Sequence, residues 1–211
     1  MCYDPGVARR QRVFQQERAQ KTYESILRAA ARVFPKKGFD KTQTPDIAKA
    51  AGISVGAVYK YFEDKREIFL EMLENHLNAV RAEVAERLAP ELFVGGDPQG
   101  AIARVLDVLF DQIGKDPALA KVYLAMSLTD KDVERIRRES ETYDREFLAN
   151  VIGGWLPRER IPDPHAAAIV IERAVTGTAI DCALGATTIS AEQAKAALQS
   201  MILRYLFGEP S

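Results

Sequence analysis

The sequence is poor in the residues from which metal sites, disulfide frameworks and catalytic triads are built. Its 211 residues include two cysteines, Cys2 and Cys182, and two histidines, His76 and His165. Cysteines so far apart, one of them at the extreme N-terminus, fit a reducing cytoplasm better than a disulfide scaffold. The histidines have no cysteine or carboxylate pair beside them, which argues against a zinc site or a triad. We therefore expect no cofactor and no metal, and an enzyme is the weaker alternative.

Long apolar runs are also lacking. The N-terminal stretch MCYDPGVARRQRVFQQER has no apolar core of the kind that a secretory signal needs. The most apolar segment, AAAIVIERAV, is broken by Glu172 and Arg173, so it is not a membrane span. With 47% apolar and 28% charged residues the composition is that of a soluble globular protein. We expect a soluble cytoplasmic protein that has no contact with a membrane.

The net charge of −1 is unevenly distributed. Residues 1–62 contain twelve lysines and arginines and five acidic residues, which gives this part +7 and leaves −8 for the remainder. A basic N-terminal part favours a polyanionic partner, although many solvated helix faces are basic as well.

Apolar residues recur at helical spacing along nearly the whole chain, and no alternating strand pattern persists. Gly38 and Gly52 are expected to end helices, and Asp64 with Glu67 resembles a capping box. The expected helices cover residues 20–36, 44–51, 54–62, 65–88, 101–113, 118–128, 133–155, 164–185 and 190–207, with N-caps at Thr44, Ser54, Asp163 and Ser190. The predicted fold is all-α, with three short helices, a long connecting helix and an all-helical second domain.

The second and third short helices, joined by a turn at Gly52, form a helix-turn-helix pattern. The second helix of such a motif enters the DNA major groove. It is too short to be stable alone, so Ile53, Val58 and Phe62 should anchor it against Ile47, Ala48 and Phe34. Tyr59, Lys60 and Tyr61 then face outward as donors to phosphate oxygens. The alternative is that the two tyrosines are half-buried core aromatics.

The stretch TPDIAKAAGISVGAVYKYFEDKREIFLEML (44–73) closely resembles the DNA-binding signature of the TetR family of bacterial transcriptional regulators, and ILRAAARVFPKKGFDKTQT (26–44) resembles its first helix and link. The resemblance implies phosphate contacts from Thr44, Ser54, Tyr59, Tyr61 and Lys65. It implies base or groove contacts from Gln43, Val55, Gly56, Ala57 and Lys60.

At two of these positions more than one kind of DNA contact fits the sequence. Lys60 could read a guanine or touch a phosphate. Ala57 stands where the family often has threonine or serine, and we hypothesise that Val55 and Ala57 contact thymine methyl groups instead.

The resemblance also implies three functional parts: a basic arm over 1–19, a helix-turn-helix domain over 20–65, and a helical ligand-binding and dimerisation domain over 66–211. The arm carries Arg9, Arg10 and Arg12 and is either a solubilising tail or a segment that reaches into an adjacent groove.

The last two helices are expected to pair with their symmetry mates in a homodimer. The residues expected in this interface are Ile169, Arg173, Ile180, Leu198, Met201, Ile202 and Tyr205. The alternative is that both helices only fill the core of their own chain.

The intervening helices should surround a pocket for a mostly apolar small molecule. Its candidate lining is Phe110, Tyr123, Met126, Tyr143, Phe147, Trp155, Thr178 and Asp181. Thr178 and Asp181 could equally make hydrogen bonds between subunits.

The function predicted from this pattern is a ligand-responsive regulator that binds a palindromic double-stranded DNA operator as a dimer and is released by the small molecule. Repression fits the family, and activation stays open. A helical small-molecule sensor that acts through protein partners without DNA is the runner-up.

Overall fold

The computed structural model of the protein describes residues 17–87 and 97–208, and these residues are all α-helical apart from short connections. Cys2, Arg9, Arg10, Arg12 and Leu88 lie outside the described residues. The described helices are α1 Glu17–Lys37, α2 Thr44–Ala51, α3 Val55–Val58, α4 Lys65–Arg87, α6 Pro98–Lys115, α7 Pro117–Thr129, α8 Lys131–Trp155, α9 Pro164–Leu184 and α10 Ala191–Phe207. The all-α prediction is confirmed.

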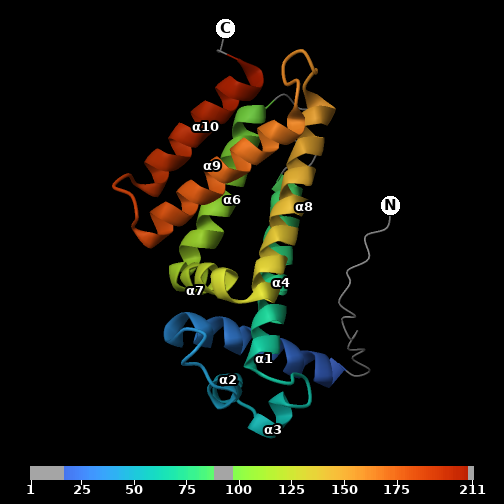
Figure 1. Ribbon diagram of the computed structural model, residues 1–211, viewed down its shortest axis with the longest axis vertical. Coiled ribbons are helices and arrows are strands. Elements are labelled where there is room, and N and C mark those ends of the chain that lie inside the picture. Colours follow the sequence, from blue (N-terminus) through green and yellow to red (C-terminus); the bar gives the residue numbers. More distant parts are fainter. Residues whose placement is uncertain (1–16, 88–96, 209–211) are drawn as a thin grey trace.

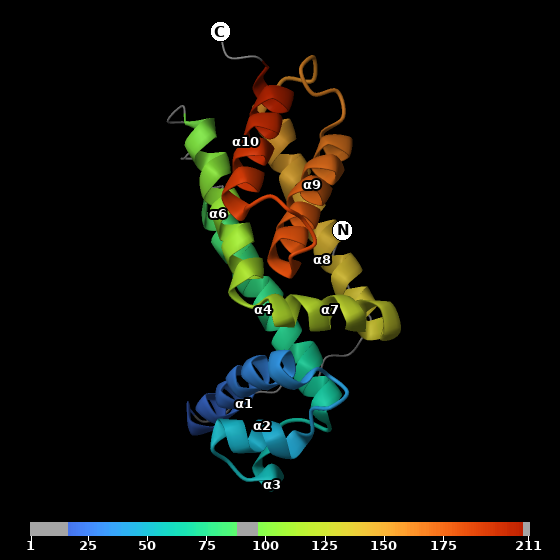
Figure 2. The same cartoon turned by 90° about the vertical axis from the view of Figure 1, so that its left-hand side faces the viewer.

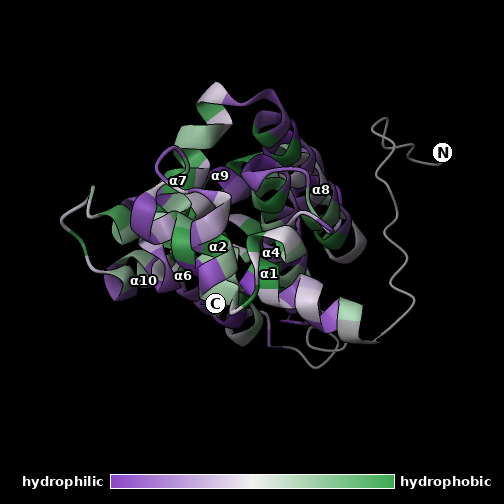
Figure 3. Cartoon of the chain, turned by 90° about the horizontal axis from the view of Figure 1, so that it is seen from below, coloured by the Kyte–Doolittle hydropathy of each residue, from purple (hydrophilic) through white to green (hydrophobic). Residues whose placement is uncertain are grey.

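The molecule is elongated, and its two ends are built differently (Figure 1). Helices α1, α2 and α3 form one end, while α6, α8, α9 and α10 form the other. Helix α4 starts beside α1 and runs into the second group, and α7 lies across the chain between the two (Figure 2). Seen from the α1–α3 end, individual helices carry both hydrophilic and hydrophobic residues, as amphipathic helices do (Figure 3).

The first core cluster anchors the short helix α3 as expected. Val58 and Phe62 are buried with Ile47, Ala48 and Phe34, and Ile53 packs against them. The cluster also contains Met126, Val133 and Ile136, which belong to α7 and α8. The core of the helix-turn-helix is therefore continuous with the helices of the other end.

A second core cluster holds the other end together. It joins one face of α6 to α8, α9 and α10, through residues such as Leu106, Ile152, Ala168 and Leu198. None of the described helices combines the length and the hydropathy that a bilayer-spanning segment requires.

The helix boundaries differ from the prediction in two places that bear on the site. Thr44 is the first residue of α2, and Gln43 takes the N-cap position with an extended backbone. Helix α3 ends at Val58, because the chain continues into a tight turn in which Tyr61 N–H donates to the Val58 carbonyl at 2.9 Å. Tyr59, Lys60 and Tyr61 thus lie in the turn after the helix and not on it. The caps at Ser54, Asp163 and Ser190 are confirmed.

Candidate functional site

The turn between α2 and α3 is fixed by two local signals. Gly52 ends α2 in a left-handed conformation (φ 72°), in which a side chain would be strained. Ser54 opens α3, because its Oγ accepts a hydrogen bond from the Ala57 N–H at 3.2 Å. The expected helix-turn-helix geometry follows directly from these residues.

The outer surface of this motif is polar and open. Gly56 and Lys60 are exposed, Tyr59 is 55% exposed, and Val55 and Ala57 are half-buried. A Cβ atom added at Gly56 would meet nothing within 4 Å, so the packing of the protein does not itself require glycine there. The missing side chain instead leaves room for the close approach of another molecule.

Tyr61 differs from its neighbours. It is half-buried and packs against the first core cluster, with its ring centroid 6.4 Å from that of Tyr23. Tyr23 in turn stacks on Phe62 at 5.3 Å. The outward position expected for three consecutive residues therefore holds for Tyr59 and Lys60, and only in part for Tyr61.

The ammonium group of Lys65 is committed within the protein. Its Nζ donates to the carbonyl oxygens of Phe39 at 2.9 Å, Asp40 at 3.0 Å and Thr42 at 2.9 Å. It also lies 4.7 Å from the centre of the Phe39 ring. An ammonium has three donors, and all three have acceptors here. The expected phosphate contact of this group is corrected: Lys65 ties the loop after α1 to the start of α4.

The loop that Lys65 holds leads into two further predicted contact residues. Thr44 is only 7% exposed, which leaves little of its surface for a phosphate. Gln43 is exposed, and its N–H donates to Asp46 Oδ2 at 2.9 Å. Lys37 Nζ lies 2.5 Å from Asp46 Oδ1, and this bond lowers the pKa of Asp46.

A cavity of about 210 Å³ lies among α4, α6, α8, α9 and α10. Three of the predicted lining residues, Tyr143, Phe147 and Trp155, do line it. The other five do not: Phe110 is buried in the second core cluster, Met126 and Tyr123 belong to the first, and Thr178 and Asp181 of α9 lie away from the lining. That part of the expectation is wrong, because apolar spacing along one helix does not distinguish packing on a neighbour from facing a void.

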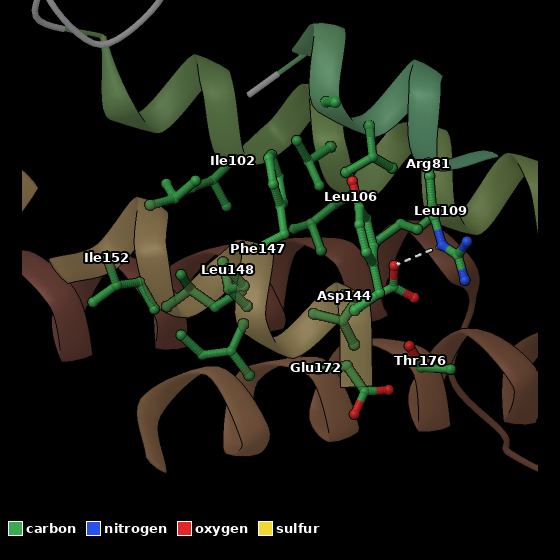
Figure 4. Close-up of a pocket in the computed structure, with 18 of the residues that line it drawn as sticks. Arg81, Ile102, Leu106, Leu109, Asp144, Phe147, Leu148, Ile152, Glu172 and Thr176 are labelled. Carbon is green, nitrogen blue, oxygen red and sulfur yellow. Dashed lines mark hydrogen bonds and ion pairs between the residues drawn. The ribbon is translucent and has the colours of Figure 1, made fainter. Parts of the chain in front are cut away.

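Polar groups gather at one side of this cavity (Figure 4). Arg81 of α4 donates from Nε to Asp144 Oδ1 of α8 at 3.3 Å, and its guanidinium lies 4.9 Å from the centre of the Tyr143 ring. Glu172 and Thr176 approach from α9. Burial raises the pKa of Asp144, although Arg81 opposes this shift. No sequence pattern pointed to these residues, since charged residues at helical spacing resemble a solvated face.

Apolar side chains are exposed on α9 and α10. Of the residues predicted for a dimer interface, Ile169 is 46% exposed, Met201 42% and Tyr205 47%. Arg173 is also exposed, and Ile180 is half-buried. Leu198 and Ile202 are corrected, because both are buried in the core of their own chain. An exposed apolar face on two neighbouring helices favours a partner.

An ion-pair cluster joins the two ends of the molecule and has no signal in the sequence. Arg66, in the first turn of α4, donates from Nε and Nη2 to the two oxygens of Asp130 at 2.7 and 2.8 Å. Its Nη2 also donates to Asp132 Oδ2 at 2.6 Å. Asp130 is the N-cap of α8, where it accepts from the N–H of Val133 at 3.2 Å. The start of α4 and the start of α8 are therefore held by one bidentate pair.

The comparisons with known proteins agree with this geometry. Residues 26–72 match the family model described as "Bacterial regulatory proteins, tetR family". The probable regulator ArpR of Pseudomonas putida is 32% identical over 176 residues, which cover 76% of this chain and 80% of the relative. The regulator TtgR, also of Pseudomonas putida, is 31% identical over 176 residues, with the same shares of the two chains.

The solved structures show the same fold. A putative TetR-family transcriptional regulator from Mesorhizobium loti superposes with a TM-score of 0.73 over 90% of this chain and 98% of that chain, at 21% sequence identity. Because the matched sequence includes the helix-turn-helix and the relatives cover most of the chain, the protein belongs to the TetR family of bacterial transcriptional regulators, which bind DNA through this motif.

Proposed function

We propose that the protein is a ligand-responsive repressor, which binds a palindromic operator as a homodimer and leaves it when a small, mostly apolar molecule enters the cavity. The observation that carries this proposal is the position of the cavity. Its lining includes residues of α4 and α8, the two helices whose first turns meet at Arg66 and Asp130, next to the helix-turn-helix.

The DNA contacts of the proposal come from the exposed residues of the motif. Tyr59 and Ser54 are the candidates for phosphate contacts, with a smaller part for Tyr61 and Thr44, and with backbone N–H groups at the start of α4 in place of the Lys65 ammonium. Gln43, Val55, Gly56, Ala57 and Lys60 are the candidates for the groove. Contacts to phosphate set the register, and contacts to base edges set the sequence.

Dimerisation is proposed through α9 and α10. A single helix-turn-helix reads few base pairs, and dimers present two of them about 34–36 Å apart. The exposed side chains of Ile169, Met201 and Tyr205 give each chain an apolar face for its copy. The functional parts are proposed as predicted, with the helix-turn-helix over 20–65 and the ligand-binding and dimerisation part over 66–211.

The coupling between ligand and DNA would use both helices that reach from the cavity to the motif. Leu77, Val80 and Arg81 of α4 line the cavity, and Lys65 and Arg66 at its start hold the loop before α2 and the cap of α8. A ligand that separates α4 from α8 shifts the population toward dimers whose motifs no longer match one turn of DNA.

Fluorescence anisotropy with DNA from upstream of the protein's own coding region, over a salt series, tests the proposal. We expect a preferred palindrome and a steep loss of affinity with salt. Lys60→Ala should weaken binding, whereas Lys121→Ala, an exposed lysine on α7, should not. A dimer that binds small molecules but no DNA sequence would contradict the proposal and favour the sensor that acts through protein partners.

A further inference from the structure

The charges on the cavity wall bear on the chemistry of its ligand. We propose that the cavity takes a mostly apolar molecule with one positively charged nitrogen, which Asp144 and Glu172 receive. This inference rests on the proposed effector-binding role of the cavity and adds the class of ligand to it.

The lining is apolar except at one side. Aliphatic and aromatic side chains from five helices form most of it, and three of its residues have side chains that form ion pairs: Arg81, Asp144 and Glu172. Asp144 pairs with Arg81 inside the lining, while Glu172 pairs with Arg145 at 3.1 Å and lies 3.7 Å from Arg173, and these two arginines are not part of the lining. Two carboxylates and one guanidinium therefore face the cavity at this side, and a ligand group that donates hydrogen bonds to carboxylates suits them.

The single positive charge is already engaged. Arg81 donates to Asp144 from Nε, donates to Asn78 Oδ1 from Nη1 at 2.9 Å, and lies over the Tyr143 ring. An anionic ligand would have to displace Asp144 from Arg81 and then stand beside two carboxylates. The geometry thus disfavours an anion at this side of the cavity.

The two carboxylates keep unused acceptor capacity. Asp144 has long hydrogen bonds, at 3.3 Å from Arg81 and 3.4 Å from the Ser140 hydroxyl. For Glu172, the bonds that the described residues make, from Arg145 at 3.1 Å, all reach Oε2. Burial raises the pKa of Asp144, and the nearby charge of Glu172 raises it further. A cation beside Asp144 offsets both the cost of burying this carboxylate and its repulsion by Glu172.

Aromatic rings complete the match. Tyr143, Phe147 and Trp155 line the same cavity from α8. Phe147 lies about one turn along α8 from Asp144, where the face of its ring can attract an ammonium group. Tyr143 already faces Arg81, and Trp155 lies about three turns further along, where the aliphatic wall suits an alkyl or aryl body. The same rings give an anion no comparable contact.

Three probes with one alkyl chain and different head groups test the inference: decyltrimethylammonium, decanol and decanoate, each below its micelle concentration. Isothermal titration of the full-length protein should give an ammonium affinity about tenfold or more above that of the alcohol, with decanoate the weakest. The release of labelled operator DNA is measured with each probe in parallel.

Matched variants separate charge from structure. Asp144→Asn should lower the ammonium affinity about tenfold, leave decanol within about threefold and strengthen decanoate, because Arg81 loses its partner. Glu172→Gln should weaken ammonium binding as well and serves if Asp144→Asn does not fold. Glu146→Gln, on α8 but exposed and 3.8 Å from His165, should change none of the three affinities.

The remaining outcomes contradict either the charge preference of the cavity or the proposed regulation of DNA binding. Equal or tighter binding of decanol or decanoate, no binding of any probe, or an equal loss of all three in Asp144→Asn, overturns the charge preference. If decanol or decanoate releases DNA while the ammonium does not, the effector cavity stands and this inference fails. If the ammonium binds with the expected preference but leaves DNA affinity unchanged, the charge preference stands and the proposed regulation fails.

Discussion

The two ends of the molecule use their aromatic and charged residues in opposite ways. At the α1–α3 end, aromatic rings pack on one another, as Phe34 does on Phe69 at 5.1 Å, and help to fill the core. At the other end, Tyr143, Phe147 and Trp155 border a cavity of about 210 Å³. One end packs its rings into a filled core behind the helix-turn-helix, and the other leaves a space of the kind that small molecules occupy in proteins.

The difference extends to what each end leaves exposed. The motif exposes polar groups around Tyr59 and Lys60, whereas α9 and α10 expose Ile169, Met201 and Tyr205. A polar surface suits phosphate, and an apolar surface suits a second copy of the chain. A change at one end, followed by a measurement of the function of the other, tests whether the two ends act together.

The largest effect is expected from a charge on the apolar face of α9. Ile169→Glu would bury a carboxylate in the proposed interface, so the chain should elute as a monomer in light-scattering chromatography. Because two linked motifs bind far more tightly than one, operator affinity should fall about 100-fold or more. Leu128→Glu on α7, where the leucine is 85% exposed, is the control and should stay dimeric. A monomeric Ile169→Glu with full operator affinity would contradict the link between the two ends.

The second largest effect is expected from a comparison of two lysines, five residues apart, of which one should affect stability and the other DNA affinity. Lys65→Met removes three charge-assisted hydrogen bonds to the loop carbonyls and should cost about 1.5–3 kcal/mol of unfolding free energy. Lys60→Met leaves an exposed position and should keep stability while DNA affinity falls about tenfold. Urea unfolding and DNA titration of both variants make the comparison. The reverse pattern, with Lys60→Met unstable and Lys65→Met weak only in DNA binding, would restore the phosphate role of Lys65.

These lysines also show which features of the structure can be predicted from the sequence. Local residues such as Gly52 and Ser54 made the turn of the helix-turn-helix predictable, although the N-cap of α2 and the end of α3 at Val58 were not. The acceptors of Lys65 lie 23 to 26 residues away, which no local pattern reveals. The resemblance and the place of Lys65 at the start of a helix therefore predicted a phosphate contact that the structure does not support.

The cavity was predictable only as a region. Trp155 and Phe147 share an apolar stripe with residues that are merely packed, and spacing along α8 cannot separate the two. Arg81 and Asp144 are 63 residues apart, so their pairing depends on how α4 crosses α8. The exposed apolar face of α10 was predictable in part, since Met201 and Leu198 have the same period on α10 but opposite burial.

A smaller effect is expected where the two ends are joined. Arg66→Met removes the bidentate pair with Asp130 and the bond to Asp132, and should lower stability by about 1–2 kcal/mol, because Arg66 is 40% exposed and partly screened. Operator affinity without ligand should change little, while the factor by which ligand lowers it should shrink. Arg138→Met, which removes a pair within α8 whose arginine is 70% exposed, is the control. An unchanged ligand effect in Arg66→Met would show that α4 carries the coupling alone.

The smallest effect concerns the entry to α2. Lys37 lowers the pKa of Asp46 in the folded protein, so the pair adds stability above the unfolded pKa of about 4 and loses it as pH falls through the folded value. Asp46→Asn keeps an oxygen for the Gln43 N–H and removes only the charge. Its melting temperature should lie slightly below that of the native chain at pH 7, and the gap should close toward pH 3. Asp40→Asn, an exposed neighbour, should show no such gap. If the gap in Asp46→Asn persists at pH 3, the cap and not the ion pair accounts for the stabilisation, and the position of Gln43 is set by backbone hydrogen bonds alone.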